Sequence, residues 1–478
     1  MRLLIKDGSV IDPSQNLGEV ADLLVVDGKI AEIASDLMTT VSPQIPGIQV
    51  IDAAGCIVAP GFVDLHCHLR QPGDEDKETI ATGTRAAARG GFTTLCAMPN
   101  TTPPADTAAA VRQLREIASR DGVVRVFPVG TITKGRAGKE LAEMAELQEA
   151  GAVAFSDDGS PVVDGRIMRN ALLYSTMLGL PLLSHSEERD LSADSDMNEG
   201  ALCTLLGLRG NPAAAEVAAV AREIALAELT GGHVHICHVS TAGAVELIRQ
   251  AKARGVPVTA EASPHHLTLS EAWVAGGALS SVLPLAASAP LIPVPPDFPP
   301  YHPHTKVSPP LRSRADLEAL WAGLRDGTID AIATDHAPHT WVDKECEFGY
   351  AAPGISGLET ALPLLLALSQ RDIVDLPTLV GALACNPARI LGLPYGTLNV
   401  GRPADVVIFD PEEEWVVDPA ALASKGKNTP LSGVTLRGRV RWTLVEGNVV
   451  WGPPPIPGEQ YQPRPNSSRL EGLLETRE

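Results

Sequence analysis

The sequence predicts an α/β fold: a (β/α)8 barrel of the TIM type with a small flanking β-sandwich. From about residue 56 to 370, short apolar runs alternate with helical patterns. The runs are unbroken, which is typical of parallel strands buried on both faces. Shorter strand patterns lie before and after this region. We therefore expect residues 1–55 and 395–452 to form the two parts of the β-sandwich, 56–394 the catalytic barrel and 453–478 a loosely held tail.

Eight apolar runs are the predicted barrel strands. In chain order they are CIVAPGFVDLHCH, GFTTLCAMPN, VVRVFPVGT, AVAFSDDG, LPLLSHSEE, HVHICHVS, VPVTAEASPHH and IDAIATDHAPH. Helix-like stretches such as DKETIATGTRAAARGG and TAGAVELIRQAKARG lie between them and end in glycine, which favours a left-handed C-cap. Eight such units predict a closed barrel.

The flanking segments have a different pattern. ADLLVVDGKIAEI near the N-terminus and VRWTLVEGNVVWG near the C-terminus combine short strands with turn signals. Between the last two predicted barrel strands, residues 281–305 contain eight prolines. That density predicts an extended loop, which is either a lid or contact surface at the barrel mouth or a passive surface insertion.

Composition excludes several classes of function. The chain has 38 Lys and Arg against 58 Asp and Glu, a net charge of −20, and its basic residues are scattered, so we expect no nucleic-acid partner. The N-terminus lacks a signal-peptide pattern, and no run of 18 apolar residues is present, which predicts a cytoplasmic protein without a membrane partner. The seven cysteines form no CxxC pair, so they are predicted to be small buried hydrophobic residues.

Histidines and aspartates gather at the ends of the predicted strands. His66 and His68 are two positions apart, so they project to the same side of a strand and can share a metal. Such a pair alone could also be structural. The other strand ends carry Asp157, Asp158, His185, His238 and Asp335. Barrel enzymes assemble their sites at these C-terminal ends, and burying so many of these groups without a cation would be costly.

Histidine and carboxylate ligands without thiolates suit zinc, and related divalent metals fit the same ligand types. Six ligands are too many for one tetrahedral ion, whereas two ions bridged by a carboxylate accommodate them. Such a pair lowers the pKa of water enough to make a nucleophile near neutral pH. The pattern therefore predicts hydrolytic chemistry.

Several motifs, in this order along nearly the whole barrel, resemble those of dihydroorotases of the amidohydrolase superfamily. They are GFVDLHCHLRQPG, AMPNTTP, AFSDDG, HVHICHVS, TAEASPHH, SPPLRS and ATDHAPH, followed by GISGLETA, NPARILGL and GKNTP. The resemblance implies two zinc ions per chain, one bound by His66, His68, Asp158 and Asp335, and the other by Asp158, His185 and His238. Spacing alone does not separate Asp157 from Asp158; the resemblance favours Asp158 as the bridge.

The resemblance also implies the reversible cyclisation of N-carbamoyl-L-aspartate to L-dihydroorotate, a step of de novo pyrimidine synthesis. Asp335 would carry the proton to the departing ring nitrogen. Arg70, Asn100 and His339 would hold the substrate carboxylate, and Ser308, Pro353 and Gly354 are further expected substrate contacts. A rim salt bridge is the alternative role for Arg70, and a turn role is the alternative for Asn100.

One residue departs from the family pattern: Ser308 in SPPLRS stands where relatives usually carry asparagine. A rival reading is a hydantoinase, dihydropyrimidinase or allantoinase, but such enzymes typically bridge their metals with a carboxylated lysine, and the SDDG segment has none. A second rival is a non-catalytic partner of aspartate carbamoyltransferase, which would be expected to lose ligand histidines. A complex with that enzyme and a homo-oligomeric state are both expected from the resemblance.

Overall fold

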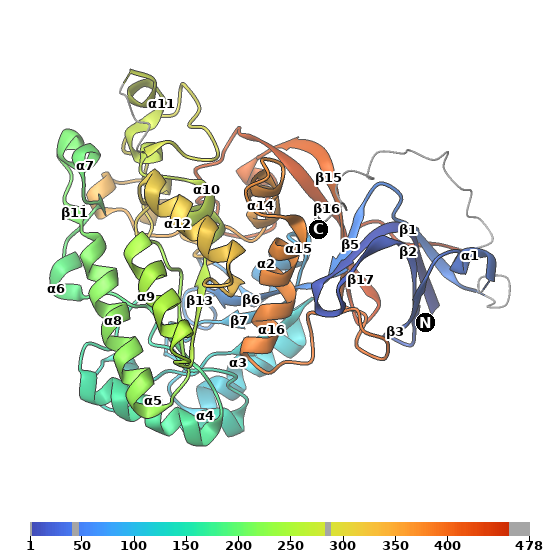
Figure 1. The fold of residues 1–478 in the computed structure, drawn as a ribbon, viewed down its shortest axis with the longest axis horizontal. Helices are drawn as coiled ribbons and strands as arrows, with labels where there is room; N and C mark the ends of the chain where they lie inside the picture. Colours follow the sequence, from blue (N-terminus) through green and yellow to red (C-terminus); the bar gives the residue numbers. More distant parts are fainter. Residues whose placement is uncertain (1, 41–46, 283–287, 458–478) are drawn as a thin grey trace.

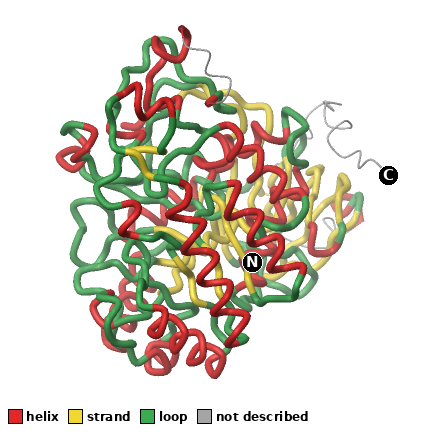
Figure 2. The backbone as a smooth tube through the Cα atoms, turned by 60° about the vertical axis from the view of Figure 1, so that its left-hand side comes forward, coloured by secondary structure: helices red, strands yellow, loops and turns green. Residues whose placement is uncertain are grey.

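The computed structural model describes residues 2–40, 47–282 and 288–457 of the chain. Figure 1 shows two regions: an α/β body that carries most of the helices, and a β-rich region that contains the N-terminus. In Figure 2 the strands of the body lie at its centre, with helices around them. No helix in the described part of the chain is both long and apolar enough to cross a bilayer.

The central strands of the body are short and parallel. They are β6 (Phe62–Cys67), β7 (Phe92–Ala97), β8 (Arg125–Pro128), β9 (Leu182–Ser184), β12 (Val234–Ile236), β13 (Val258–Ala262) and β14 (Ala331–Ile332). The described pairings are β6-β7-β8 in one sheet and β9-β12-β13-β14 in another. Parallel bridges from Phe155 to Gly130 and Leu182 join the two sheets at one side, and a bridge from Cys67 to His336 joins them at the other. The parallel pairing therefore begins at β6 and returns to it.

Two predicted strands differ from their sequence pattern. AVAFSDDG contributes only bridges at Phe155, because the chain turns immediately afterwards at Gly159, whose φ is 71°. CIVAPGFVDLHCH is divided at Gly61 into β5 (Ile57–Pro60) and β6. A Cβ at Gly61 would lie 2.3 Å from the Thr93 side chain, so only glycine permits this close approach.

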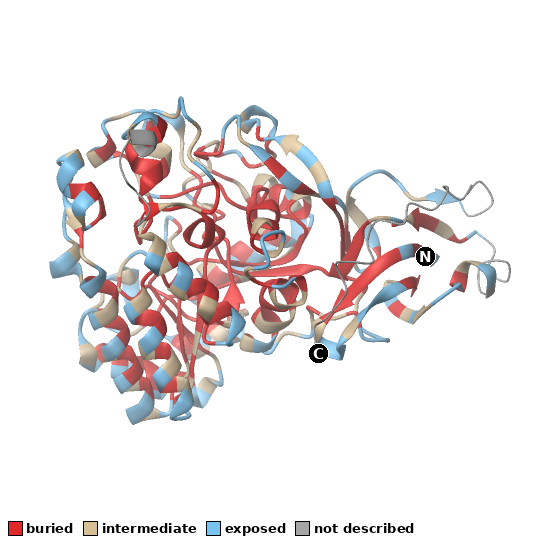
Figure 3. Ribbon diagram, turned by 45° about the horizontal axis from the view of Figure 1, so that its top comes forward, coloured by how far each residue is buried: buried red, intermediate tan, exposed pale blue. Residues whose placement is uncertain are grey.

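Helices follow most of the central strands and cover them. The longer ones are α2 (Ile80–Arg89), α3 (Ala108–Asp121), α4 (Met144–Ala150), α5 (Gly165–Leu178), α8 (Ala213–Thr230), α9 (Ala242–Ala253), α11 (Ala272–Val282), α12 (Arg314–Arg325) and α14 (Ala361–Ser369). The shorter ones are α1 (Leu37–Thr40), α6 (Arg189–Ser192), α7 (Ala201–Leu206), α10 (Pro264–Thr268), α13 (Trp341–Lys344), α15 (Leu376–Val380) and α16 (Asn386–Ile390). Figure 3 shows buried central strands and helices that expose only their outer faces.

The N- and C-terminal segments pair in a single sheet, which has nine strands within the described residues. Its strands are β1 (Arg2–Asp12), β2 (Leu17–Val26), β3 (Lys29–Ala34), β4 (Gln49–Asp52), β5, β15 (Val406–Val416), β16 (Thr435–Val445), β17 (Asn448–Trp451) and β18 (Ile456–Pro457). The two segments meet where β5 pairs with β15. The sheet thus reaches beyond residue 55, and at the other end it includes Ile456 and Pro457, which pair with β4. The rest of the predicted tail, 458–478, lies outside the described residues.

The predicted hairpin turns of this sheet are present. Asp27 and Gly28 join β2 to β3, and both have positive φ values of 48° and 78°. Glu446 and Gly447 join β16 to β17 with φ values of 48° and 75°. Two successive positive φ values match the right-handed twist of the paired strands.

All seven cysteines are free; five are buried, as predicted for small hydrophobic residues, whereas Cys346 and Cys385 are half-buried. The proline-rich segment packs against α11: Phe298 stacks edge-on against Trp273, whose indole nitrogen donates to the Ile292 carbonyl (3.0 Å). No residue from 288 to 305 lines the cavity described below. Residues 283–287 of the predicted loop lie outside the described residues.

Candidate active site

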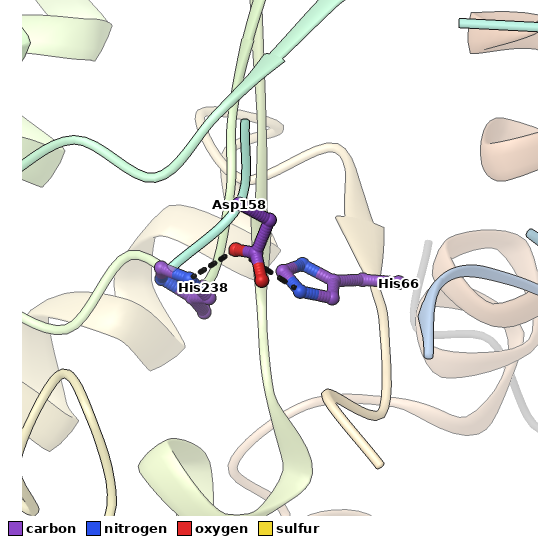
Figure 4. A group of neighbouring side chains, drawn as sticks. All are labelled: His66, Asp158 and His238. Carbon is purple, nitrogen blue, oxygen red and sulfur yellow. Dashed lines mark ion pairs between the residues drawn. The ribbon is translucent and has the colours of Figure 1, made fainter. Parts of the chain in front are cut away.

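The six predicted metal ligands meet at the carboxyl ends of the central strands. Asp158 lies in the middle (Figure 4): its Oδ1 is 3.3 Å from His66 Nε2 and 3.6 Å from His238 Nε2. The Nδ1 of His185 is also 3.6 Å from this oxygen and 2.9 Å from His238 Nε2. Segments that are far apart in the sequence therefore direct three imidazoles at one carboxylate.

Asp335 faces the other side of the same group. Its Oδ1 lies 3.3 Å from His68 Nε2 and 3.7 Å from His66 Nε2. His68 Nε2 is in turn 3.5 Å from Oδ2 of Asp158. Asp335 has a positive φ of 47°, and its backbone N–H donates to the carbonyl of His66 (3.0 Å), which places its side chain beside the histidine pair.

The donor atoms fit divalent cations. His66, His68 and Asp335 form one group whose donor atoms lie within 4.8 Å of one another, and His66, Asp158 and His238 form a second. Two of these atoms, His66 Nε2 and Asp158 Oδ1, are buried and have no hydrogen-bond partner among the described residues. Unpartnered buried polar atoms are costly, and a cation between them would satisfy both. A third group, His66, Cys237 and Glu261, is already joined by a 3.0 Å hydrogen bond from His66 Nδ1 to Glu261.

The electrostatics agree with this interpretation. Burial raises the pKa of Asp158, but the charge of His66 and hydrogen bonds with the imidazoles outweigh it, so the pKa lies well below its usual range. Burial lowers the pKa of His66, but the charge of Asp158 outweighs it and raises that pKa well above normal. Protonation of His66 stabilises the neighbouring Asp158 carboxylate here. A bound cation would take the place of that proton, because metal ligands must be deprotonated.

Outer hydrogen bonds orient the histidines. Glu261 of β13 accepts from His66 on one oxygen and lies 3.0 Å from His235 on the other. The Oδ1 of Asn100 lies 3.0 Å from His68 Nδ1, so this predicted substrate residue also holds a metal-ligand candidate. Such partners fix the ring orientation of ligand histidines. Sequence reasoning did not find Glu261, although it is the one carboxylate within the TAEASPHH motif.

The geometry separates the two neighbouring aspartates. Asp157 Oδ1 accepts from the backbone N–H groups of Ile132 (2.9 Å) and Thr133 (3.1 Å), and its Oδ2 accepts from the Thr133 hydroxyl. Its carboxylate is therefore occupied in holding a turn, whereas that of Asp158 faces the imidazoles. His266 is similarly structural, since its ring nitrogens contact the Ser263 hydroxyl (2.7 Å) and the Pro309 carbonyl (2.9 Å).

A cavity of about 530 Å³ opens beside these ligands. All six predicted substrate residues line it: Arg70, Asn100, Ser308, His339, Pro353 and Gly354. Five of the six metal-ligand candidates line it as well; His66 lies beneath and is fully buried. The structure thus brings the predicted site residues together around one space.

Arg70 is a cation without a carboxylate partner. Its Nε donates to the Pro338 carbonyl (3.2 Å), and its Nη2 lies 3.4 Å from His339 Nε2. No carboxylate lies within ion-pair distance of its guanidinium in the described part of the chain. Burial and the Arg70 charge lower the pKa of His339 to about 3, so its ring is neutral. The cavity therefore presents an unpaired guanidinium to an anionic group.

The wall around Ser308 is made by two loops bound together. The backbone N–H of Gly354 donates to the Lys306 carbonyl (2.9 Å), and the buried Lys344 ammonium donates to the carbonyls of Pro303 (3.1 Å) and Lys306 (3.3 Å). Gly354 has a φ of 140°, and a Cβ there would lie 2.6 Å from the Ala337 side chain and 2.8 Å from its carbonyl. Only glycine fits this position.

Other residues of the cavity wall were not found from the sequence. They are Gly159, Glu187, Arg189, Ser192, Ala193, Asp194 and Ala337. Glu187 had a usable signal: it follows His185 by two positions, the spacing that relates His68 to His66. The short helix α6 and the residues after it gave no periodic pattern that would place them over the cavity.

Comparisons with known proteins agree on one family. The family model described as dihydro-orotase-like matches residues 55–244. A dihydroorotase of Geobacter sp. (strain M21) is 49% identical over 451 residues, which cover 94% of this chain and 99% of that protein. A dihydroorotase of Pelotomaculum thermopropionicum is 49% identical, with 94% of this chain and 98% of that protein covered.

Among solved structures, an L-hydantoinase (dihydropyrimidinase) from Arthrobacter aurescens superposes with a TM-score of 0.80 at 27% identity, covering 94% of this chain and 96% of that one. A D-hydantoinase from Thermus sp. superposes with a TM-score of 0.75 at 26% identity, covering 94% of each chain. These structures share the architecture at much lower identity than the curated relatives. With half of its residues identical to those of such relatives over nearly its full length, this chain belongs to the dihydroorotase family.

Proposed function

We propose that this chain catalyses the reversible cyclisation of N-carbamoyl-L-aspartate to L-dihydroorotate in pyrimidine synthesis, on a (β/α)8 barrel that binds two zinc ions. The observation that carries the proposal is the arrangement around Asp158, whose carboxylate faces His66, His185 and His238, with His68 and Asp335 on its other side. The 49% identity to curated dihydroorotases supports the substrate assignment.

Two ions would be held by His66, His68 and Asp335 on one side and by His185 and His238 on the other, with Asp158 between them. His66 belongs to both groups of donor atoms, so it would hold an ion together with His68 and Asp335. When bound, such ions lower the pKa of water and polarise an amide carbonyl. The other steps depend on the side chains of this chain.

Ring opening adds water across the cyclic amide. The C–N bond breaks, oxygen joins the carbonyl carbon, and a proton must reach the departing nitrogen. Asp335 lies at the cavity wall beside the histidines, and its low pKa, set by His68 and the nearby imidazoles against the effect of burial, leaves it ionised and able to accept that proton. Closure of the ring uses the same group in the opposite direction.

Arg70 would pair with the substrate carboxylate that does not react. Its guanidinium has no carboxylate partner in the described residues, and His339 next to it is neutral. A planar guanidinium can hold a carboxylate with two hydrogen bonds, which fixes the substrate ring relative to Asp335. Ser308, Pro353 and Gly354 line the same cavity, and so does Asn100.

A hydantoinase-like activity is the alternative function, and the similarity to solved hydantoinase structures supports it. Against it, no lysine lines the cavity in the described part of the chain, and Asp158 occupies the position between the ligand histidines. A non-catalytic scaffold is disfavoured because all six ligand candidates are present. A cytoplasmic location, a homo-oligomeric state and a complex with aspartate carbamoyltransferase remain parts of the proposal.

The test combines metal analysis with a direct assay. Purified protein reconstituted with zinc should hold about two ions per chain and interconvert dihydroorotate and N-carbamoyl-L-aspartate, because six ligands with one bridge describe a two-metal site. Zinc content that stays near zero after supplementation, with activity intact, would contradict the metal assignment. Two bound ions without turnover of dihydroorotate would contradict the substrate assignment.

A further inference from the structure

A run of polar side chains leads from His185 through Glu187, in the cavity wall, to the buried Asn211 and Arg312. The Nε2 of His185 lies 3.6 Å from Glu187 Oε2, while its Nδ1 faces Asp158 Oδ1 at 3.6 Å. The two ring nitrogens therefore point to different carboxylates. When one nitrogen of an imidazole donates to a carboxylate, the other is left to bind a cation.

Glu187 is itself held in place. Asn211 Nδ2 donates to its Oε1 (3.0 Å). Asn211 ends the short strand β11 (Gly210–Asn211), in which it lies opposite Asn198 of β10 (Met197–Asn198). The Asn211 side chain can offer its amide nitrogen to Glu187 only if its amide oxygen points the other way. That oxygen accepts from Arg312 Nη2 (3.1 Å), which fixes the orientation of the amide.

Arg312 is an unusual residue at this position because only 1% of its surface is exposed. No carboxylate lies within ion-pair distance of it in the described chain; its partners are neutral. Nη1 donates to the Asn211 carbonyl (2.8 Å) and Asn198 Oδ1 (2.9 Å), and Nε donates to Ser240 Oγ (3.1 Å). A buried guanidinium with four donated bonds to three segments is expensive to desolvate but rigid once in place.

We propose that Arg312, Asn211 and Glu187 form a relay of positioning residues that sets the orientation of His185, so that its Nδ1 is the nitrogen presented to the metal beside Asp158. The inference rests on the proposed two-metal function. It gives the arginine of the SPPLRS motif a positioning role, because the relay acts through hydrogen bonds and not through contact with substrate.

The test measures zinc affinity with a chromophoric chelator, together with zinc stoichiometry, kcat and KM. Glu187→Ala should weaken one of the two zinc sites by roughly 10- to 100-fold, the usual effect of losing such a partner, and leave the other site unchanged. Asn211→Ala should weaken the same site by less. The double variant should match Glu187→Ala alone, because Asn211 acts only through Glu187.

Glu188→Ala is the matched control. Glu188 is the adjacent carboxylate in the chain, but it pairs with Arg222 (2.7 Å) and not with His185. It should retain wild-type zinc affinity. Arg312→Lys is a further variant: it keeps the buried charge, loses the planar guanidinium, and should weaken the same zinc site as Asn211→Ala does.

A purely structural role would lower the melting temperature of these variants without changing the zinc affinity of the folded protein, and would overturn the relay. Wild-type affinity at both sites in Glu187→Ala would overturn it too. Both results leave the proposed function intact, since wild-type protein would still bind two ions and turn over dihydroorotate. Wild-type protein that binds no zinc would overturn the relay and the proposed function together.

Discussion

The two sides of the cavity are built differently. On the metal side, the side chains come from the ends of parallel central strands, as with His66 near the end of β6, His68 directly after it and His238 after β12. On the opposite side, Ser308 and Gly354 belong to loops joined to each other by hydrogen bonds of Lys306 and Lys344. Strand pairing therefore positions the ligand candidates at the strand ends, whereas the substrate wall depends on contacts between loops.

The largest expected effect is on the metal side. Asp158→Ala removes the carboxylate that faces three imidazoles, so the protein should lose zinc and with it nearly all activity. Asp157→Ala should lose less, because that carboxylate caps Ile132 and Thr133 instead. Zinc analysis and turnover of both variants check this ranking. Reconstitution should also be independent of bicarbonate, because no lysine needs carboxylation; the reverse ranking of the two aspartates would exchange their roles.

The next effect concerns proton transfer. Asp335→Asn keeps the size of the side chain but removes the proton carrier, so kcat should fall by roughly 100-fold or more. Zinc content must be measured on the same sample, since Asp335 also lies 3.3 Å from His68 Nε2 and metal loss would imitate the effect. Turnover near the wild-type rate in a zinc-loaded variant would remove Asp335 from the mechanism.

The smallest expected effect concerns Lys344, whose hydrogen bonds hold the cavity wall around Ser308. Burial, together with the charge of Lys306, lowers the pKa of Lys344 to about 7 from 10.5. Between these values the unfolded chain binds more protons than the folded one, so this group makes stability rise with pH, by at most about 1.4 kcal/mol per pH unit. Lys344→Met lacks this dependence.

The melting temperature of Lys344→Met minus that of wild type should therefore decrease as the pH rises from 7 to 10. The exposed Lys139→Met variant is the control and should follow wild type at every pH. Parallel curves for Lys344→Met and wild type would mean that Lys344 keeps its proton in the folded protein. A raised KM for dihydroorotate in the variant would further tie Lys344 to the wall that carries Ser308.

How much of the structure could be predicted from the sequence also differs between the strand ends and the regions set by tertiary contacts. Apolar runs with polar ends brought the six ligand candidates to one place, because a strand end fixes a side chain with little help from elsewhere. The pattern failed where tertiary contacts decide: AVAFSDDG keeps only the bridges of Phe155, and β5 leaves the barrel run to pair with β1 and β15. Glu261 and Arg312 were missed because their partners are distant in sequence.

The central claim is that the site recognises a cyclic amide by its carboxylate. Dihydrouracil has the same ring amide as dihydroorotate but lacks that group, so it would leave the Arg70 guanidinium unpaired. The direct measurement is the ratio of kcat/KM for the two compounds, in wild type and in Arg70→Met. An unmatched buried charge costs on the order of 2–5 kcal/mol, so wild type should prefer dihydroorotate by roughly 30-fold to several thousand-fold, and Arg70→Met should lose most of that preference. Equal turnover of dihydrouracil by wild type would contradict the account and favour a hydantoinase-like function.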